Sequence, residues 1–176
     1  ILGKMLNDGE IISVCRGRAE WGARALGNRS IIAKSGSREI VEKINAQIKM
    51  RDFWMPFAPT ILDEKLKLCV DDKNNLEPDF MTFALPTKNR AYDSLAGAMH
   101  PVDKTCRPQV LKEKTNPKLH KMLNSYCDKY EQYGVLQTSF NIHGEPIVNN
   151  AEDAFSTLNR SGLRHLLLEN FLISKN

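Results

Sequence analysis

The sequence predicts an α/β domain in which helices pack against a β-sheet. Short apolar segments of strand length alternate along the chain with segments whose apolar residues recur at helical spacing. The 176 residues, 41% hydrophobic and 26% charged, suit one domain with a core of its own. Three loops rich in hydrogen-bond donors interrupt these segments, at residues 18–30, 51–59 and 139–146. If these loops converge in the fold, they form a cleft for an anion.

In the first half of the chain, turn and cap residues delimit each element. Ile40, Val41, Ile44 and Ile48 follow helical spacing behind Ser37, which is a suitable N-cap. The elements expected here are a helix end over residues 1–6, strands over 10–15 and 31–33, the helix that follows Ser37, and a short helix over 63–70.

The second half carries two helices with clear starts. Asn116 precedes Pro117, an N-cap followed by a first-turn proline. Asn150 caps another helix, whose Phe155 and Leu158 are expected to face inward. The strands expected here are residues 80–85, a short strand just after Arg107, and residues 135–138, 166–168 and 171–173.

The densest functional pattern is residues 17–30, GRAEWGARALGNRS, where arginines alternate with glycines. Glycine lets backbone approach a ligand closely, and guanidinium groups fit phosphate and carboxylate oxygens. An idle charged loop would carry lysine and glutamate with few large apolar residues, whereas this stretch holds Trp21 and Leu26. The pattern therefore predicts an anion site, although it does not name the anion.

The other two loops are candidates for the same site. Residues 51–59, RDFWMPFAP, are too rich in proline for a helix or a central strand, so we expect an ordered loop packed by its own aromatic side chains. Arg51 is either a ligand group or a charge at a helix C-terminus. Residues 139–146 follow a strand, where α/β sheets commonly bind ligands. Asn141 there either contacts a ligand or caps the following turn.

Composition narrows the classes of partner. The net charge is +4 and the lysines are dispersed, which favours a small anionic substrate over a nucleic acid. The four cysteines form no CxxC pair or zinc spacing, so we expect reduced thiols and no metal site. No apolar run reaches membrane-spanning length, and we expect a cytoplasmic protein without a membrane partner. Because the sequence starts inside a helix and without an initiator methionine, we expect a fragment of a longer protein.

Four motifs together resemble one family. They are GRAEWGARALGNRS, RDFWMPFAP, TCRPQV and TSFNIHGEPIV, in this order and at these intervals. The chain resembles the C-terminal domain of O-carbamoyltransferases of the nodulation and antibiotic-biosynthesis type, which include the tobramycin, cephamycin and Nod-factor enzymes. The resemblance covers the chain from about residue 17 to residue 171.

The resemblance implies a fold, a reaction and a partner domain. The fold is a YrdC-like twisted mixed β-sheet flanked by helices, over residues 1–176. Such a domain takes carbamoyl phosphate and ATP with Mg²⁺ and forms carbamoyl adenylate, releasing pyrophosphate and phosphate. An N-terminal domain of the actin/sugar-kinase type, which holds a metal ion and is missing here, then passes the carbamoyl group to a hydroxyl of a small-molecule acceptor.

The resemblance also implies roles for particular residues. Arg24 and Arg107 match positions that hold carbamoyl phosphate, and Ser139 matches a hydroxyl at the same site, so we assign these three to catalysis. Guanidinium groups are suited to this because they neutralise negative charge that builds up in the transition state. The residues expected to bind substrate are Arg18, Asn28 and Arg29, which face the nucleotide or brace the loop, together with Arg51 and Asn141, for which a hydrogen bond to the carbamoyl amide is one of the two roles.

Three positions depart from the family pattern. Met55 stands where many relatives carry an arginine that contacts carbamoyl phosphate, and a thioether has no such charge. Residue 137 is Gln where relatives usually have Asn, and residue 23 is Ala where many have Pro. Either Arg51 or Arg29 supplies the missing charge, or the carbamoyl phosphate site of this subgroup is altered.

Two other functions compete with the enzyme hypothesis. YrdC-like folds also serve as RNA- or nucleotide-binding modules, but the dispersed lysines and the lack of interleaved aromatic and basic residues count against RNA. A degenerate domain kept for regulation is the other alternative. Met55 favours that alternative, whereas the presence of Arg24, Arg107 and Ser139 counts against it.

Overall fold

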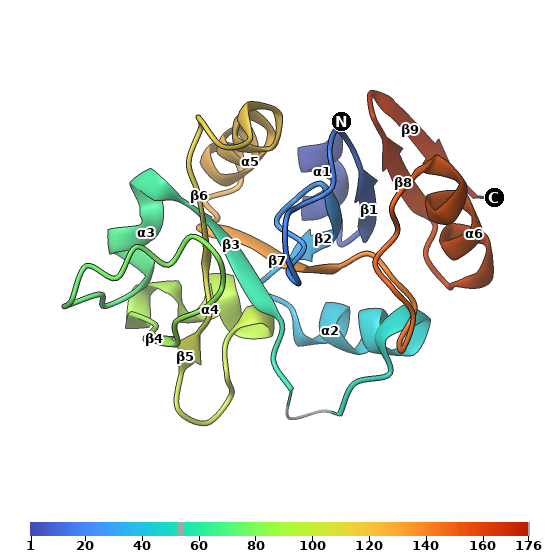
Figure 1. The fold of residues 1–176 in the computed structure, drawn as a ribbon. Helices are drawn as coiled ribbons and strands as arrows, with labels where there is room; N and C mark the ends of the chain where they lie inside the picture. The colour runs from blue at the N-terminus through green and yellow to red at the C-terminus, as the bar shows by residue number, and fades with distance from the viewer. Residues whose placement is uncertain (53–54, 176) are drawn as a thin grey trace.

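The computed structural model describes residues 1–52 and 55–175 and contains a mixed sheet of seven strands, ordered β6-β3-β7-β2-β1-β8-β9 (Figure 1). The β3–β6 and β1–β8 pairs are parallel and the other pairs are antiparallel. A separate ladder joins β4 (Leu85–Pro86) to β5 (Thr105–Cys106). The strands of the main sheet are β1 (Ile12–Cys15), β2 (Arg29–Lys34), β3 (Ala58–Leu62), β6 (Gln109–Leu111), β7 (Gly134–Ser139), β8 (His165–Leu168) and β9 (Phe171–Ser174).

Helices flank both faces of the sheet, which confirms the predicted fold class. The N-caps predicted for three of them are formed: the side chains of Ser37, Asn116 and Asn150 each accept a hydrogen bond from a first-turn backbone N–H. None of the helices in the described ranges is both long and apolar enough to cross a membrane. The α-helices are α1 (Leu2–Asn7), α2 (Arg38–Ile44), α3 (Asp63–Cys69), α4 (Tyr92–Leu95), α5 (Pro117–Lys129) and α6 (Ala151–Arg160).

The core is divided by the sheet into two layers. Because side chains alternate along a strand, Ile31 and Ala33 of β2 pack beneath α2 and α6, whereas Ile32 packs on the other face beneath α1 and α5. All three are fully buried. A third apolar cluster lies beyond β3, where α3 and α4 pack around Ile61 (Figure 1).

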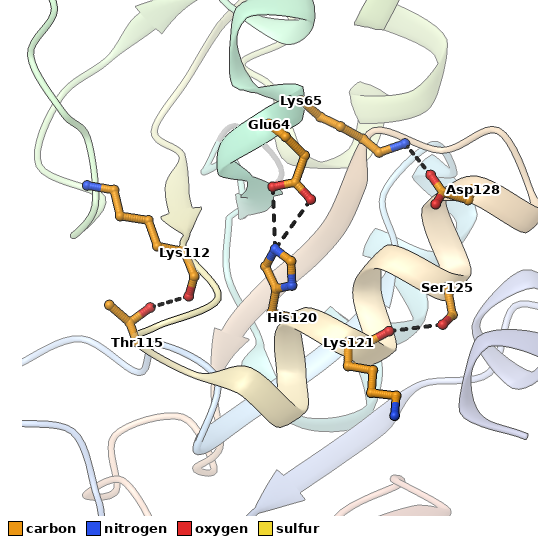
Figure 2. A network of polar contacts seen from close by, with 8 residues as sticks. All are labelled: Glu64, Lys65, Lys112, Thr115, His120, Lys121, Ser125 and Asp128. Carbon is orange, nitrogen blue, oxygen red and sulfur yellow. Dashed lines mark hydrogen bonds and ion pairs between the residues drawn. The ribbon is translucent and has the colours of Figure 1, made fainter.

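Polar contacts connect helix α3 to helix α5 (Figure 2). His120 lies 3.3 Å from the Glu64 carboxylate, and Lys65 lies 2.8 Å from that of Asp128. Ion pairs with exposed partners contribute about 0–1 kcal/mol each. The buried face of α5, which includes Leu123, therefore holds this helix more strongly than the ion pairs do.

The strand predicted over residues 80–85 is wrong except at its end. Only Leu85 belongs to a strand. Met81 adopts a left-handed backbone conformation with φ of 58°, which interrupts an extended chain, and Phe80 and Phe83 remain partly exposed. The apolar composition of this segment therefore reflects a surface and not a buried strand.

Two further expectations are corrected. The loop predicted over residues 51–59 is shorter than expected, because Ala58 and Pro59 belong to β3. Phe53 and Trp54, two of the aromatic residues expected to pack this loop, lie outside the described residues. Proline is accepted there because β6 pairs with β3 only from Thr60 onward, so at Pro59 the strand has one bonded neighbour, as at a sheet edge. Phe155, expected to face inward, is 39% exposed, since α6 buries Ala154, Thr157 and Leu158 and Phe155 lies about 100° around the helix from Ala154.

The strand directions bring the predicted functional loops to one edge of the sheet. Strands β1 and β7 end at this edge, and β2, β3 and β6 begin there; for example, Ser30 at the start of β2 pairs with Ser139 at the end of β7. Residues 16–28, which connect β1 to β2, lie over this edge, together with the chain before β3 and after β7.

Candidate functional site

A small pocket of about 60 Å³ opens at this edge of the sheet. Its wall includes Arg24 from the β1–β2 loop, Arg51 from the chain before β3 and Arg107 from the chain before β6, together with Gln137 and Ser139 of β7. Among the described residues that line the pocket, none is acidic. The three loops do converge here, and their convergence produces a concentration of positive charge.

The three guanidinium groups influence one another. Burial lowers the pKa of Arg51, and the charges of Arg107 and Arg24 lower it further. The Arg51 side chain is held by a 3.1 Å hydrogen bond to the Thr138 hydroxyl and lies 4.9 Å above the ring of Phe57. Of the two roles open to Arg51, its position favours that of a ligand group. Repulsion among these like charges, with no carboxylate among the described residues of the pocket wall, indicates a site that an anion completes.

Lys49 was missed from the sequence and proves to be the buried cation nearest to Ser139. It is 3% exposed, and its Nζ donates to Ser139 Oγ at 3.2 Å and to Asn141 Oδ1 at 2.7 Å. Burial, followed by the charge of Arg51, lowers the pKa of Lys49 to about 7. The lysine ends a π-helical turn, Asn45–Lys49, that extends α2. A lysine adjoining the apolar stripe of that helix is the signal that could have found it.

Glu20 organises the β1–β2 loop that carries Arg24. One carboxylate oxygen of Glu20 accepts hydrogen bonds from the backbone N–H groups of Leu26 and Asn28 at 2.7 Å and of Arg29 at 3.3 Å. This loop also needs glycine at residue 27, where φ is +115° and an added Cβ would lie 2.3 Å from Leu119. The loop is therefore preorganised from within.

Arg29 is brought into the interior and away from the pocket wall. It is 6% exposed, and its guanidinium donates five hydrogen bonds, all to backbone carbonyls of the β1–β2 loop and of Asn149. Asn28 is likewise engaged, because its amide donates to the Arg18 carbonyl and its Oδ1 accepts from Asn116. These contacts favour the bracing role for both residues. Arg18 has an exposed side chain and does not line the pocket.

Asn141 shapes the loop after β7. Its amide nitrogen donates to the carbonyls of Ile142 and Glu145, at 3.0 and 2.7 Å, so it caps the turn. Its Oδ1 accepts from Lys49 and, at 2.6 Å, from the Ser139 hydroxyl. With both amide hydrogens engaged, Asn141 acts here by positioning Lys49 and Ser139.

A second, more open pocket of about 430 Å³ adjoins the first. The two share Arg24, Arg107 and Met81, and the second is also lined by the aromatic residues Trp21 and Phe80. Trp21 is fully exposed and Phe80 is 59% exposed. Small-molecule sites combine apolar and aromatic walls with a few polar groups, as this arrangement does.

Another pocket of similar size, about 420 Å³, lies along α3 and does not suit an anion. Its lining carries five carboxylates against three lysines, so its net charge is negative and would repel an anion; the carboxylates are those of Asp63, Asp71, Asp72, Glu77 and Asp79, and the lysines are Lys67, Lys88 and Lys112. The described residues contain no group of three or more His, Cys, Asp or Glu side chains placed to hold a metal ion. Cys69 and Cys127 are buried free thiols whose pKa is raised to about 12 by burial, so they remain protonated.

Solved structures with a similar fold reproduce the architecture. Full-length HypF, in its phosphate- and nucleotide-bound form, superposes with a TM-score of 0.64 over 99% of this chain and 25% of its own, at 18% identity. Escherichia coli YciO superposes with a TM-score of 0.63 over 98% of this chain and 85% of its own, at 16% identity. At these identities the likeness concerns the YrdC-like fold alone.

Sequence relatives extend the comparison. Residues 3–175 match the family model described as Carbamoyltransferase C-terminus. MJ1051 of Methanocaldococcus jannaschii is 41% identical over 99% of this chain, and nodulation protein NolO of Bradyrhizobium diazoefficiens is 36% identical over 96%. The 3'-hydroxymethylcephem-O-carbamoyltransferase of Streptomyces clavuligerus is 32% identical over 86%. The chain spans only 33%, 31% and 28% of these relatives, respectively.

Proposed function

Because this chain belongs to the carbamoyltransferase C-terminal family, we propose that it binds carbamoyl phosphate in the pocket of Arg24, Arg51 and Arg107 and forms carbamoyl adenylate with ATP and Mg²⁺. The single observation that carries the proposal is that three guanidinium groups and Ser139 line one pocket, with Lys49 bonded to Ser139 and no carboxylate among the described residues of the pocket wall. Such a site matches a small dianion. A long polyanion would need an extended basic surface.

The proposed roles follow from charge and hydrogen bonding. Arg24 and Arg107 neutralise the phosphate oxygens, and their strength as partners increases as negative charge builds up on the departing phosphate. Arg51 supplies the third positive charge, which in many relatives comes from an arginine at the position of Met55. Ser139, held by Lys49 and Asn141, offers a hydroxyl at the end of β7.

The adjoining pocket is the proposed place for the nucleotide. Trp21 and Phe80 offer aromatic faces to a base, and Arg24 and Arg107, which both pockets share, lie between the two substrates. Cleavage of the carbamoyl–phosphate C–O bond with one water releases inorganic phosphate and leaves carbamate. A carbamate oxygen then bonds to the α-phosphorus of ATP and pyrophosphate departs, which gives carbamoyl adenylate.

Transfer to an acceptor is proposed for the longer protein. The curated relatives are about three times the length of this chain. In the proposal an N-terminal actin/sugar-kinase-like domain, with a metal ion of its own, takes the carbamoyl group from the adenylate to a hydroxyl of a small molecule. The cephem carbamoyltransferase, whose name specifies an acceptor hydroxymethyl group, supports this class of acceptor.

The test is release of pyrophosphate from ATP and Mg²⁺ by the purified chain with and without carbamoyl phosphate. We expect pyrophosphate only when carbamoyl phosphate is present, and loss of that release in Arg107→Gln. Arg164→Gln is the matched control, because this exposed arginine precedes β8 at the opposite edge of the sheet. Failure of the chain both to bind carbamoyl phosphate and to release pyrophosphate would contradict the proposal.

A further inference from the structure

Gln137 has a buried hydrogen-bond acceptor that finds no partner among the described residues. Its side chain lies in β7, is 1% exposed and lines the arginine pocket. The Oε1 atom accepts no hydrogen bond from any of the described residues. Buried polar atoms without a partner are rare in folded proteins, so this one calls for a reason.

The orientation of the Gln137 amide is fixed by its neighbours. Its Nε2 donates to the carbonyl of Ala25 at 3.0 Å and to Oε1 of Gln109 at 2.6 Å. A rotated amide would bring its oxygen against two other acceptor oxygens, which is unfavourable.

The Gln109 amide is fixed in the same way. Its Nε2 donates to the carbonyl of Leu26 at 2.8 Å, and its Oε1 accepts from the Thr60 hydroxyl at 3.1 Å. A concerted rotation of both amides would bring acceptor oxygens against the Ala25 and Leu26 carbonyls. The unpaired Oε1 of Gln137 is thus held on the side away from these carbonyls.

The chemistry of the pocket shows what kind of group would complete Oε1. The charged groups in the wall, Arg24, Arg51 and Arg107, are all donors, so they bind acceptor oxygens. A bare phosphate has acceptor oxygens to satisfy them but offers little to Gln137. A ligand that satisfies both carries a hydrogen-bond donor next to its anionic end, and an amide N–H is such a donor.

We propose that Oε1 of Gln137 accepts a hydrogen bond from the carbamoyl NH₂, which makes Gln137 a specificity-determining residue that selects a carbamoyl group over an acyl group without N–H. This inference rests on the proposed function. It adds a recognition element that the arginines do not provide, because they respond to the phosphate in either ligand.

The test uses two hydrolysis-resistant probes, phosphonoacetamide and phosphonoacetone, which differ by an NH₂ in place of a CH₃. Calorimetric titration of the purified chain should show phosphonoacetamide binding about tenfold more tightly, the effect of one hydrogen bond to an otherwise unpaired acceptor. In Gln137→Met, which keeps the length of the side chain without the acceptor, the two affinities should become equal.

A matched control is Thr60→Val, which removes the outer member of the same network without reaching the pocket, since Thr60 bonds Gln109 and not Gln137. The Thr60→Val variant should keep the tenfold preference for phosphonoacetamide. If that variant lost the preference, the preference would depend on packing and not on the Gln137 acceptor, and the inference would be overturned. The wild-type comparison stands even if the Gln137 variant fails to fold. Equal affinities in the wild type would overturn the role of Gln137 alone, whereas no binding of either probe would overturn the proposed function as well.

Discussion

The Nζ of Lys49 lies 2.7 Å from the Oδ1 of Asn141, in a bond between the end of the α2 extension and the loop after β7. The same oxygen accepts from the hydroxyl of Ser139, so a buried cation and a hydroxyl share one acceptor beside the arginine pocket. This arrangement links two sequence-distant segments and gives the site a group that titrates near neutral pH.

Anion binding should be accompanied by proton uptake at pH 8. Because the pKa of Lys49 is lowered to about 7, the free protein holds it mostly neutral at pH 8, and a bound dianion raises its pKa and favours the charged form. Titrations of carbamoyl phosphate in Tris and in HEPES should give different enthalpies, corresponding to uptake of up to about one proton. At pH 6, where Lys49 is already charged, the uptake should disappear.

The control for that experiment is Lys49→Met, which should bind more weakly and show no dependence of enthalpy on the buffer at pH 8. Affinity in the wild type should also fall as pH rises above 7, since the ammonium is then progressively lost. Buffer-independent enthalpies in the wild type would mean that Lys49 does not respond to the ligand.

Replacement of either Arg24 or Arg107 by Gln should weaken carbamoyl phosphate binding by about 1.5–3 kcal/mol, the usual value of a charged hydrogen bond. Both residues line the pocket, so the loss should appear in the calorimetric affinity and not in the urea midpoint. Arg164→Gln serves again as the control. Wild-type affinity in both pocket variants would remove them from the site.

Arg51 should be as important as these two, and Met55 should matter little. Arg51 lies in the pocket wall, whereas Met55 is 39% exposed and does not line it. We expect Arg51→Gln to reduce affinity about tenfold, and Met55→Arg to improve it by less than about 1 kcal/mol, as for an exposed charge. A large gain in Met55→Arg would show that the wild-type site lacks a charge that Arg51 does not supply.

Arg29→Met should destabilise the fold by about 3 kcal/mol. The change removes five hydrogen bonds and leaves buried carbonyls in the β1–β2 loop without donors. Urea denaturation measures the free energy of unfolding, and the exposed control Arg164→Met should stay within about 0.5 kcal/mol of the wild type. An equally small change in Arg29→Met would argue against the bracing role.

Elements that are determined by residues close together in the sequence were predicted correctly. Ser37, Asn116 and Asn150 were identified as caps because an N-cap depends on a side chain and the backbone two or three residues beyond it. The alternation of strands and helices predicted the α/β class, but it left open whether the three loops converge, because it does not fix the order of the strands.

Features that depend on distant contacts were missed. Lys49 looks like other basic residues in the sequence, yet it lies against Ser139, about 90 residues away. For Arg29 the sequence left the nucleotide-facing and bracing roles open, because its partner Asn149 is about 120 residues away. Pro59 falls within the predicted loop although it belongs to β3. A strand tolerates proline there only because β6 begins to pair with β3 at Thr60, which the sequence does not reveal. The unpaired Oε1 of Gln137 depends on a network with Gln109 that sequence spacing does not reveal.

The most direct test of the carbamoyl phosphate site is calorimetric titration of carbamoyl phosphate into the purified chain, with and without a non-hydrolysable ATP analogue and Mg²⁺. We expect saturable binding that Arg24→Gln weakens at least tenfold and Arg164→Gln leaves unchanged. Absence of saturable binding under both conditions, in a chain shown to be folded, would contradict it.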